Sequence, residues 1–354
     1  MTRALLLGLL LPGSIVFGSG TSDLKRDQEV VFFPSVGRCL DGTNWEIQVH
    51  GCVYEPDKRR VALALLREAL ALDHVHMTES ENAIFTERAR LFMVDHKGGK
   101  RIVAHIGGRD FDVGKSRADG HFFAVVRLSE AEAQGMTNGG SSLQAVLKKK
   151  DARVFTGEVE LFGDTGVTVI SDIDDTIKMT GVQDRKATLR RTFLEPFEPV
   201  PGMAEVYRAW AKDRNAQFCY ISASPWQLFT PLTDFLRSNG FPAGVFYLKK
   251  FRWKDESFSS LFESPEKYKP AIIEPLLKEF PKRRFVLVGD SGERDPEIYA
   301  ALAREHPQQI VRILIRDLGH ENSESERFER AFHDLPPSLW LVFREPAEIK
   351  SVLR

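Results

Sequence analysis

The chain has 354 residues, 42% of them hydrophobic and 28% charged, and its formal net charge at pH 7 is -1. That length is enough for two domains with separate cores, and the composition is that of an ordinary globular protein. A nearly balanced charge excludes a global field that attracts nucleic acid, so no nucleic-acid partner is expected. Three cysteines without CxxC spacing exclude a disulfide scaffold and a cysteine metal site.

The first 20 residues have the pattern of an export signal. Arg3 precedes an apolar run over residues 4–11, and the small residues 18–20 end the segment. A short positive region, an apolar region and a small-residue end are typical of secretory signal peptides. We therefore expect a signal peptide over residues 1–20 and export to the periplasm or the medium, with a retained N-terminal membrane anchor as the alternative. No transmembrane segment is expected after signal removal.

The cysteines leave one question open. Cys39 and Cys52 could pair if the protein is exported, or they could remain two buried or half-buried thiols. Cys219 lies inside an apolar run and is predicted to be part of the core.

Short apolar runs separated by glycine-rich or polar turns recur over residues 30–163. This spacing predicts a β-sandwich-like accessory domain. One helix is predicted over residues 59–72, where apolar residues recur at helical spacing. The predicted strands cover residues 30–33, 45–49, 90–94, 101–106, 121–126 and 154–159.

Strand-like and helix-like segments alternate over residues 164–354. Such alternation predicts an α/β domain with a parallel, doubly wound sheet. The predicted strands cover residues 168–173, 216–222, 244–248, 284–289 and 310–315. The predicted helices cover residues 202–213, 225–239, 268–279 and 296–305.

A cluster of acids follows the first strand of this second domain. The apolar run over residues 167–170 leads into Asp172, Asp174 and Asp175, with Thr176 next. Ligands bind open α/β sheets just outside the carboxyl ends of the strands, where these side chains would lie. Carboxylates this close repel one another unless a cation or a proton lies among them, and Mg²⁺ prefers such oxygen ligands. The residues therefore predict phosphate chemistry with a divalent cation.

Three further segments contribute polar residues at the same edge of the predicted sheet. One strand ends at Ser222, a helix starts around Lys269, and another strand ends at Asp290 with Asp295 close behind. In chain order, the sequence offers two acids, a hydroxyl, a lysine and further acids.

This order resembles the four motifs of the haloacid-dehalogenase (HAD) phosphohydrolase superfamily. Residues 170–177, 220–226 and 287–299 are similar to the Mg²⁺-dependent phosphatidate phosphatases of the actin-patch type. The resemblance is strong over residues 167–317 and weak before them. It implies a HAD-type parallel sheet with a small cap or none, because the insert between Ile177 and Pro199 is short.

The chemistry and the resemblance give the same roles to the motif residues. Asp172 is expected to be the nucleophile that forms an aspartyl-phosphate, and Asp174 the general acid and then the general base. Lys269 is expected to neutralise the phosphate and the intermediate. Thr176 and Ser222 are expected to bind substrate, with Ser224 as the alternative to Ser222.

The magnesium site is expected to use the carboxylates of Asp172 and Asp290 and the backbone carbonyl of Asp174. Asp295 is expected either to bind the ion directly or to orient its ligands. Asp175 is expected to anchor the turn after the strand.

Two assignments near the site have rivals. Lys267 competes with Lys269, which fits the family spacing better. Lys249, Lys250 and Arg252, interleaved with aromatic residues, follow a strand that should end at the site. They either bind an anionic lipid substrate or form a solvated loop.

These observations predict a Mg²⁺-dependent phosphomonoesterase. The resemblance implies phosphatidate as substrate, a lipid phosphate at a membrane surface, with release of diacylglycerol and phosphate. One alternative is a HAD phosphatase for a soluble or polynucleotide phosphate ester. A second is a non-catalytic module that binds a phosphorylated ligand or a membrane.

Overall fold

The computed structural model describes residues 20–353 apart from residues 57–59, 71, 73, 138–142, 251–267 and 320–322. Nearly all of the predicted signal peptide lies outside these described residues and stays a prediction. The chain divides into unit 1, residues 1–59 and 93–164, and unit 2, residues 60–92 and 165–354. The predicted boundaries assign residues 60–92 to the first domain, whereas they group with unit 2.

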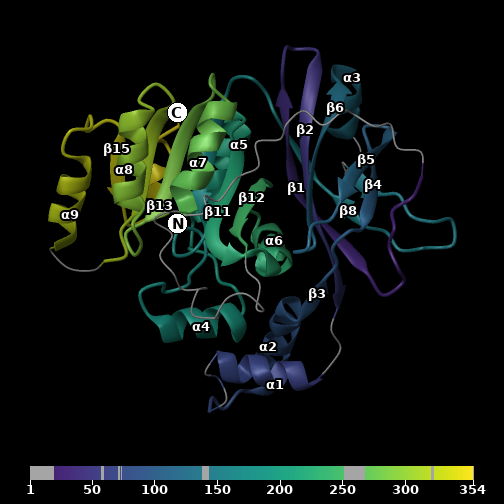
Figure 1. Ribbon diagram of the computed structural model, residues 1–354. Helices are drawn as coiled ribbons and strands as arrows, with labels where there is room; N and C mark the ends of the chain where they lie inside the picture. The colour runs from purple at the N-terminus through teal and green to yellow at the C-terminus, as the bar shows by residue number, and fades with distance from the viewer. Residues whose placement is uncertain are drawn as a thin grey trace, which may run out of the picture. The chain divides into compact units, whose positions relative to one another are not determined.

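Unit 1 contains two β-sheets (Figure 1). One has the order β3-β2-β1-β9, with β6 also paired to β2, and the other has the order β5-β4-β7-β8. Neighbouring strands are antiparallel except for β1 and β9. The elements are β1 (Glu29–Cys39), β2 (Asn44–Pro56), β3 (Val94–His96), β4 (Arg101–Ile106), β5 (Arg109–Lys115), β6 (His121–Ser129), α3 (Glu130–Thr137), β7 (Leu143–Ala145), β8 (Thr156–Gly157) and β9 (Val159–Phe162).

Both sheets contribute side chains to one hydrophobic core. Ile47 and Val49 on β2 belong to the same buried cluster as Ile102 on β4 and Phe111 on β5. Alternate residues of a strand point to opposite faces, and this explains why residues two apart on β2 share the core.

One expectation for residues 30–163 is corrected. Residues 90–92 end helix α2 (Glu79–Phe92) instead of beginning a strand. The buried residues of α2 recur at helical spacing, and they are Phe85, Arg88, Ala89 and Phe92. This spacing favours a helix over the strand that the local apolar run predicts.

Cys39 and Cys52 form no disulfide, and the first is half-buried and the second buried, as the second alternative predicted. In the β1–β2 ladder, Cys39 lies opposite Trp45 and Cys52 lies opposite Val31. At roughly 3.4 Å per residue, this register separates the two thiols far beyond the reach of a disulfide.

Gly51 provides a stability test of unit 1. An added Cβ would lie 2.3 Å from Cζ of Phe122 and 2.7 Å from the carbonyl oxygen of Val31. Gly51→Ala should therefore lower the free energy of unfolding by about 2 kcal/mol in urea titrations. The control is Gly135→Ala in α3, where a Cβ meets nothing within 4 Å. Equal stability of the Gly51→Ala variant and the unchanged protein would contradict this packing.

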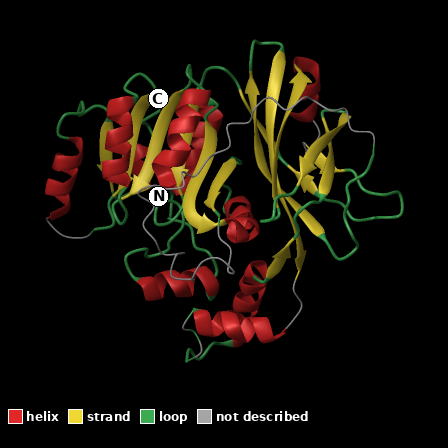
Figure 2. Cartoon of the chain, viewed as in Figure 1, coloured by secondary structure: helices red, strands yellow, loops and turns green. Residues whose placement is uncertain are grey.

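Unit 2 contains a parallel sheet of six strands, so the expectation of a mixed α/β unit with a parallel sheet is confirmed. Its strand order is β12-β11-β10-β13-β14-β15, and Figure 2 shows these strands as one twisted sheet. The strands are β10 (Val167–Asp172), β11 (Gln217–Pro225), β12 (Val245–Lys249), β13 (Arg284–Asp290), β14 (Ile310–Arg316) and β15 (Trp340–Phe343). The last of these was not predicted.

Helices connect the strands of unit 2. Parallel crossovers are right-handed, so helices placed before and after the reversal of strand order cover opposite faces of the sheet. Helices α7 and α8 lie side by side (Figure 1). The helices are α4 (Arg185–Phe193), α5 (Met203–Arg214), η1 (Trp226–Leu228), α6 (Phe229–Ser238), α7 (Tyr268–Glu279), α8 (Asp295–Glu305), α9 (Ser323–Phe332) and η4 (Pro346–Ile349).

Two helices of unit 2 come from the earlier part of the chain. Helices α1 (Arg60–Ala69) and α2 form a helical insert between β2 and β3, and α2 contacts both α4 and η1. Phe92 of α2 packs on Phe193 of α4 with ring centroids 5.5 Å apart. Among the described residues, no helix combines the length and apolarity needed to cross a membrane.

Candidate active site

The site lies where the strand order of unit 2 reverses. β10 is paired with β11 on one side and β13 on the other, so its carboxyl end is the topological switch point of the sheet. Its residues are buried from Thr168 to Asp172, because a central parallel strand is covered on both faces. Asp172 is therefore the last residue of a buried strand, with only 1% of its surface exposed.

Lys269 lies at the centre of a buried group of acids. Its Nζ is 3.0 Å from Oδ1 of Asp172 and 3.0 Å from Oε2 of Glu293, and it also donates to Oδ1 of Asp295. Lys269 is in the first turn of α7, whereas Asp295 begins α8, so the ammonium joins three separate segments. Lys269 has no exposed surface, so its charge has no water to compensate it and depends on these carboxylates.

The acids of this group outnumber the cation. Burial raises the pKa of Asp172 well above its usual range, and the neighbouring acids raise it further, although Lys269 lowers it. The pKa values of Asp290 and Glu293 are raised for the same reasons. A bound divalent cation would reverse this balance and keep the carboxyl groups ionised.

The donor set fits such a cation. Asp172, Asp290 and Asp295 each offer a carboxylate oxygen, and these atoms lie within 4.8 Å of one another. Among the described residues, Oδ2 of Asp290 has no hydrogen-bond partner although it is buried. An all-oxygen donor set with an unsatisfied carboxylate oxygen suits Mg²⁺.

Gly289 is required for this arrangement. A Cβ added at this position would lie 2.1 Å from Oδ2 of Asp295, closer than any real contact. The same carboxylate oxygen accepts a hydrogen bond of 3.2 Å from the backbone N–H of Asp290. The absence of a side chain at Gly289 therefore lets Asp295 approach the end of β13.

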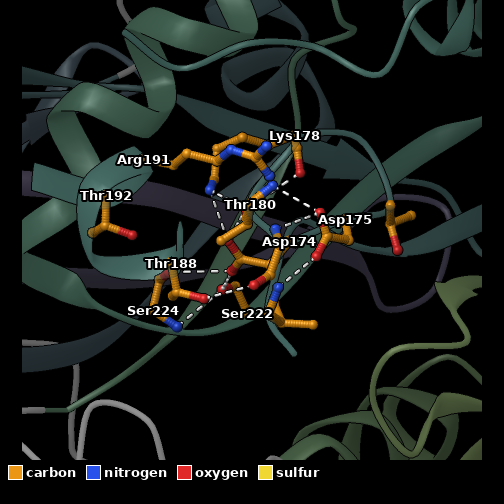
Figure 3. A network of polar contacts seen from close by, with 12 residues as sticks. Asp174, Asp175, Lys178, Thr180, Thr188, Arg191, Thr192, Ser222 and Ser224 are labelled. Atoms are coloured by element: carbon orange, nitrogen blue, oxygen red, sulfur yellow. Dashed lines mark hydrogen bonds and ion pairs between the residues drawn. The ribbon is translucent and has the colours of Figure 1, made fainter. Parts of the chain in front are cut away.

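Asp174 lies in a second polar network, shown in Figure 3. Its Oδ1 is 2.8 Å from Nζ of Lys178 and accepts a hydrogen bond of 2.8 Å from Thr180. Its Oδ2 accepts hydrogen bonds from the hydroxyl groups of Ser222, at 2.7 Å, and Ser224, at 3.3 Å. The side chain of Asp174 is thus fully engaged, and only its backbone carbonyl remains to bind a metal ion.

The network makes Asp174 a strong acid. Burial raises its pKa, but the charge of Lys178 and the hydrogen bonds from Lys178, Ser222 and Thr180 outweigh burial and lower the pKa to about 2. The pKa values of Asp172 and Asp174, which are two residues apart, are therefore shifted in opposite directions.

Asp175 has the structural role expected of it. It adopts a left-handed backbone conformation with φ 53°. Its carboxylate accepts hydrogen bonds of 2.7–2.8 Å from the backbone N–H groups of Thr180, Gly181 and Val182. These bonds hold the turn that carries Lys178 and Thr180 to Asp174.

The two hydroxyl residues expected to bind substrate are turned toward the acids. Thr176 has no exposed surface and donates to Oδ2 of Asp172 at 3.3 Å, so in this structure it orients that carboxylate. Ser222 is equally buried and donates to Asp174 while accepting from the backbone N–H of Ser224. Both serines of the predicted pair therefore contact Asp174.

The predicted basic loop is described only at its start. Lys249 ends β12. Because β11 lies between β12 and β10, these two strands are roughly 10 Å apart. Lys250 is exposed. Arg252 and Lys267 lie outside the described residues.

Sequence reasoning missed Lys178 and Glu293 as parts of the site. Lys178 lies in the short insert between Ile177 and Pro199, and its side chain is only 2% exposed. Its position four residues after Asp174, between two apolar residues, was the available signal. Glu293 lies between Asp290 and Asp295, and this crowding of acids pointed to it.

The Lys178–Asp174 pair predicts a pH-dependent loss of stability. Lys178→Met should lower the free energy of unfolding at pH 7 by about 3 kcal/mol, because a buried carboxylate loses its counter-charge. In the unchanged protein, the lowered pKa makes Asp174 stabilising above pH ~3.9, a contribution lost as the pH falls through about 2. In the variant, Asp174 can protonate at higher pH. The difference in free energy of unfolding between the variant and the unchanged protein should therefore become smaller as the pH falls from 7 to 4.

Urea unfolding at pH 7 and pH 5 measures this deficit. The matched control is Lys278→Met, which removes a partner of Glu274 at the same four-residue spacing, with 71% of the Lys278 side chain exposed. This control should change stability little at either pH. A deficit of equal size at both pH values in Lys178→Met would refute the pairing.

Comparison with known proteins finds similarity over part of unit 2. Residues 167–317 match the family model described as the catalytic domain of phosphatidate phosphatase APP1. Phosphatidate phosphatase APP1 of Saccharomyces cerevisiae is 39% identical over 162 residues, which are 45% of this chain and 27% of that protein. An uncharacterized protein of Schizosaccharomyces pombe is 31% identical over 180 residues, 50% of this chain and 29% of that protein.

The resemblance to phosphatidate phosphatases of this type is therefore confirmed over residues 167–317, which correspond to a phosphatase catalytic domain. The match includes Asp172, Asp174, Ser222, Lys269, Asp290 and Asp295. The chain spans less than a third of the length of either relative.

Proposed function

We propose that the protein is a Mg²⁺-dependent phosphomonoesterase with a HAD-type catalytic domain and an aspartyl-phosphate intermediate, and that its substrate is phosphatidate. The observation that carries this proposal is the convergence of Asp172, Lys269 and the Asp290–Asp295 turn at the carboxyl end of the central strand. The strand order of unit 2 is that of doubly wound phosphate-binding folds. The short segment around α4 supports a small cap or none.

In the first step, a carboxylate oxygen of Asp172 attacks phosphorus while the bond from phosphorus to the lipid oxygen breaks. Thr176 donates to one Asp172 oxygen and Lys269 contacts the other, so both fix the direction of attack. The Lys269 ammonium also offsets charge on the phosphoryl oxygens.

Asp174 transfers the protons. It donates a proton to the departing alkoxide, then removes one from the water that attacks phosphorus and breaks the bond to Asp172. Its lowered pKa, about 2, suits the base step, because the carboxyl is ionised at neutral pH. For the acid step, an incoming phosphate raises this pKa by placing like charge beside Lys178 and Asp174.

Mg²⁺, when bound, would supply charge neutralisation for the phosphoryl oxygens. Asp172, Asp290, Asp295 and the backbone carbonyl of Asp174 are the groups that would hold it. Glu293 would remain on Lys269, at 3.0 Å, and keep the ammonium in place.

The choice of phosphatidate depends on the similarity to the yeast phosphatidate phosphatase. The exposed Arg185 and Lys186 on α4 and the exposed Lys250 after β12 add positive charge suited to an anionic lipid surface. Export of the protein, expected from residues 1–20, remains part of the proposal.

Asp172→Asn tests the reaction. The amide cannot form the covalent phosphate ester, so hydrolysis of p-nitrophenyl phosphate should fall by at least about 10³-fold. Removal of Mg²⁺ with EDTA should have a comparable effect on the unchanged protein, and added Mg²⁺ should restore activity. Phosphate release is measured by colorimetry, with circular dichroism to verify folding. Full activity of Asp172→Asn would refute the nucleophile.

The substrate is tested separately with dioleoyl phosphatidate in mixed micelles. Mg²⁺-dependent release of phosphate and diacylglycerol should greatly exceed release from soluble phosphate monoesters and from polynucleotide ends. If only soluble esters are cleaved, the proposed phosphomonoesterase reaction stands and the proposal that phosphatidate is the substrate is overturned. Binding of micelles without any hydrolysis would favour a non-catalytic module.

A further inference from the structure

Arg88 of α2 is a buried cation with unusual partners. Only 7% of its surface is exposed. Its Nη1 donates to the backbone carbonyls of Arg191, at 3.2 Å, and Thr192, at 2.7 Å. These carbonyls belong to the last turn of α4, where the negative end of the helix dipole favours a cation. Arg88 therefore fixes the end of α4 to the inserted helix α2.

The guanidinium also lies over an aromatic ring. The Cζ atom of Arg88 is 3.9 Å from the centroid of Phe197, within the range of cation–π attraction. The Nζ atom of Lys178 is 5.0 Å from the same centroid. One ring thus contacts both a cation of α2 and the cation that holds Asp174.

The backbone strengthens this connection. The N–H of Met179 donates to the carbonyl of Glu198 at 2.9 Å, and the N–H of Val200 donates to the carbonyl of Ile177 at 2.8 Å. Phe197 and Lys178 are therefore carried by two paired segments. A shift of the Phe197 segment would be transmitted to Lys178 through these bonds and through the ring.

Lys178 in turn sets the position of the Asp174 carboxylate. It contacts Oδ1 at 2.8 Å and also donates to Thr180, which donates to the same oxygen at 2.8 Å. A continuous series of contacts thus runs from Arg88 through Phe197 and Lys178 to Asp174, and all four residues belong to unit 2.

We propose that Arg88 is a positioning residue for the reaction: from the inserted helix α2, it holds Phe197 and Lys178 so that Asp174 points correctly at the leaving oxygen. The proposal rests on the proposed function of Asp174. Arg88 lies outside residues 167–317, so the segment that matches the family model does not contain this part of the site. The catalytic unit is complete only with residues 60–92.

A double-mutant cycle in the full chain tests this proposal with p-nitrophenyl phosphate and saturating Mg²⁺. Arg88→Met should lower kcat about tenfold and change KM by less than about twofold, because a displaced acid/base group affects the chemical step more than binding. Arg88→Lys should restore much of the rate by replacing the cation over the ring. Arg88→Met combined with Lys178→Met should be no slower than Lys178→Met alone, because both act through one series of contacts.

The control is Glu81→Gln, which removes the negative charge that pairs with Arg190 at the same interface between α2 and α4. It should leave kcat unchanged. If Arg88→Met lowers the melting temperature but keeps the full kcat, or if its effect multiplies with that of Lys178→Met, the proposal is overturned.

A crystal structure of Arg88→Met separates this proposal from the proposed function. The Asp174 carboxylate should leave the positions that contact Lys178 and Ser222. An unmoved carboxylate overturns the positioning role whatever the activity. If the unchanged protein cleaves no phosphate ester, the proposed reaction fails, and a displaced Asp174 still establishes the contact series from Arg88.

Discussion

The site depends on the burial of one ammonium group among several carboxylates. Lys269 has no exposed surface and contacts Asp172, Glu293 and Asp295, which come from two strand ends and a helix start. An isolated charge in this position would be prohibitively costly, so the segments that carry its partners are held together by the need to compensate it. The same ion pairs therefore constrain how the end of β10, the turn after β13 and the starts of α7 and α8 meet at the site. Gly289 belongs to the same constraint, because its missing side chain admits Asp295 to the cluster.

The two acids of the first motif show how different surroundings shift the pKa values of identical side chains in opposite directions. Asp172 faces an excess of carboxyl groups, and burial raises its pKa. Asp174, two residues later, is surrounded by Lys178 and hydroxyl donors, and its pKa is lowered to about 2. Strongly shifted pKa values of buried titratable groups in one place are a common sign of a functional site. The turn that separates them is fixed by Asp175, whose carboxylate receives three backbone N–H groups.

Much of unit 2 could be predicted from sequence, because its strands are continuous apolar runs and its motif residues follow those runs directly. Lys269 was expected near Asp172 because the helices of an α/β sheet begin at the edge where the strands end. Helix α4 was not predicted, because it is short and strongly basic. The end of α2 was predicted as a strand, because its apolar residues also fit a short strand. The site role of Lys178 was not predicted, because its two apolar neighbours are a weak sign of burial and the folded turn is what brings this lysine to Asp174. Grouping of residues 60–92 with unit 2 depends on contacts between distant segments, which local patterns do not contain.

The insertion of α1 and α2 between two strands of unit 1 has a consequence for the order of folding. Ribosomal synthesis releases α2, which ends at Phe92, long before α4, which begins at Arg185. Until α4 emerges, Phe92 lacks its aromatic partner Phe193, and the guanidinium of Arg88 lacks the carbonyls of Arg191 and Thr192. The strands on either side, β2 and β3, can pair earlier, since both lie within the first hundred residues. The nascent chain therefore holds an unfinished helical pair beside a formed ladder, a stage at which exposed apolar surface favours capture by chaperones or association with other chains.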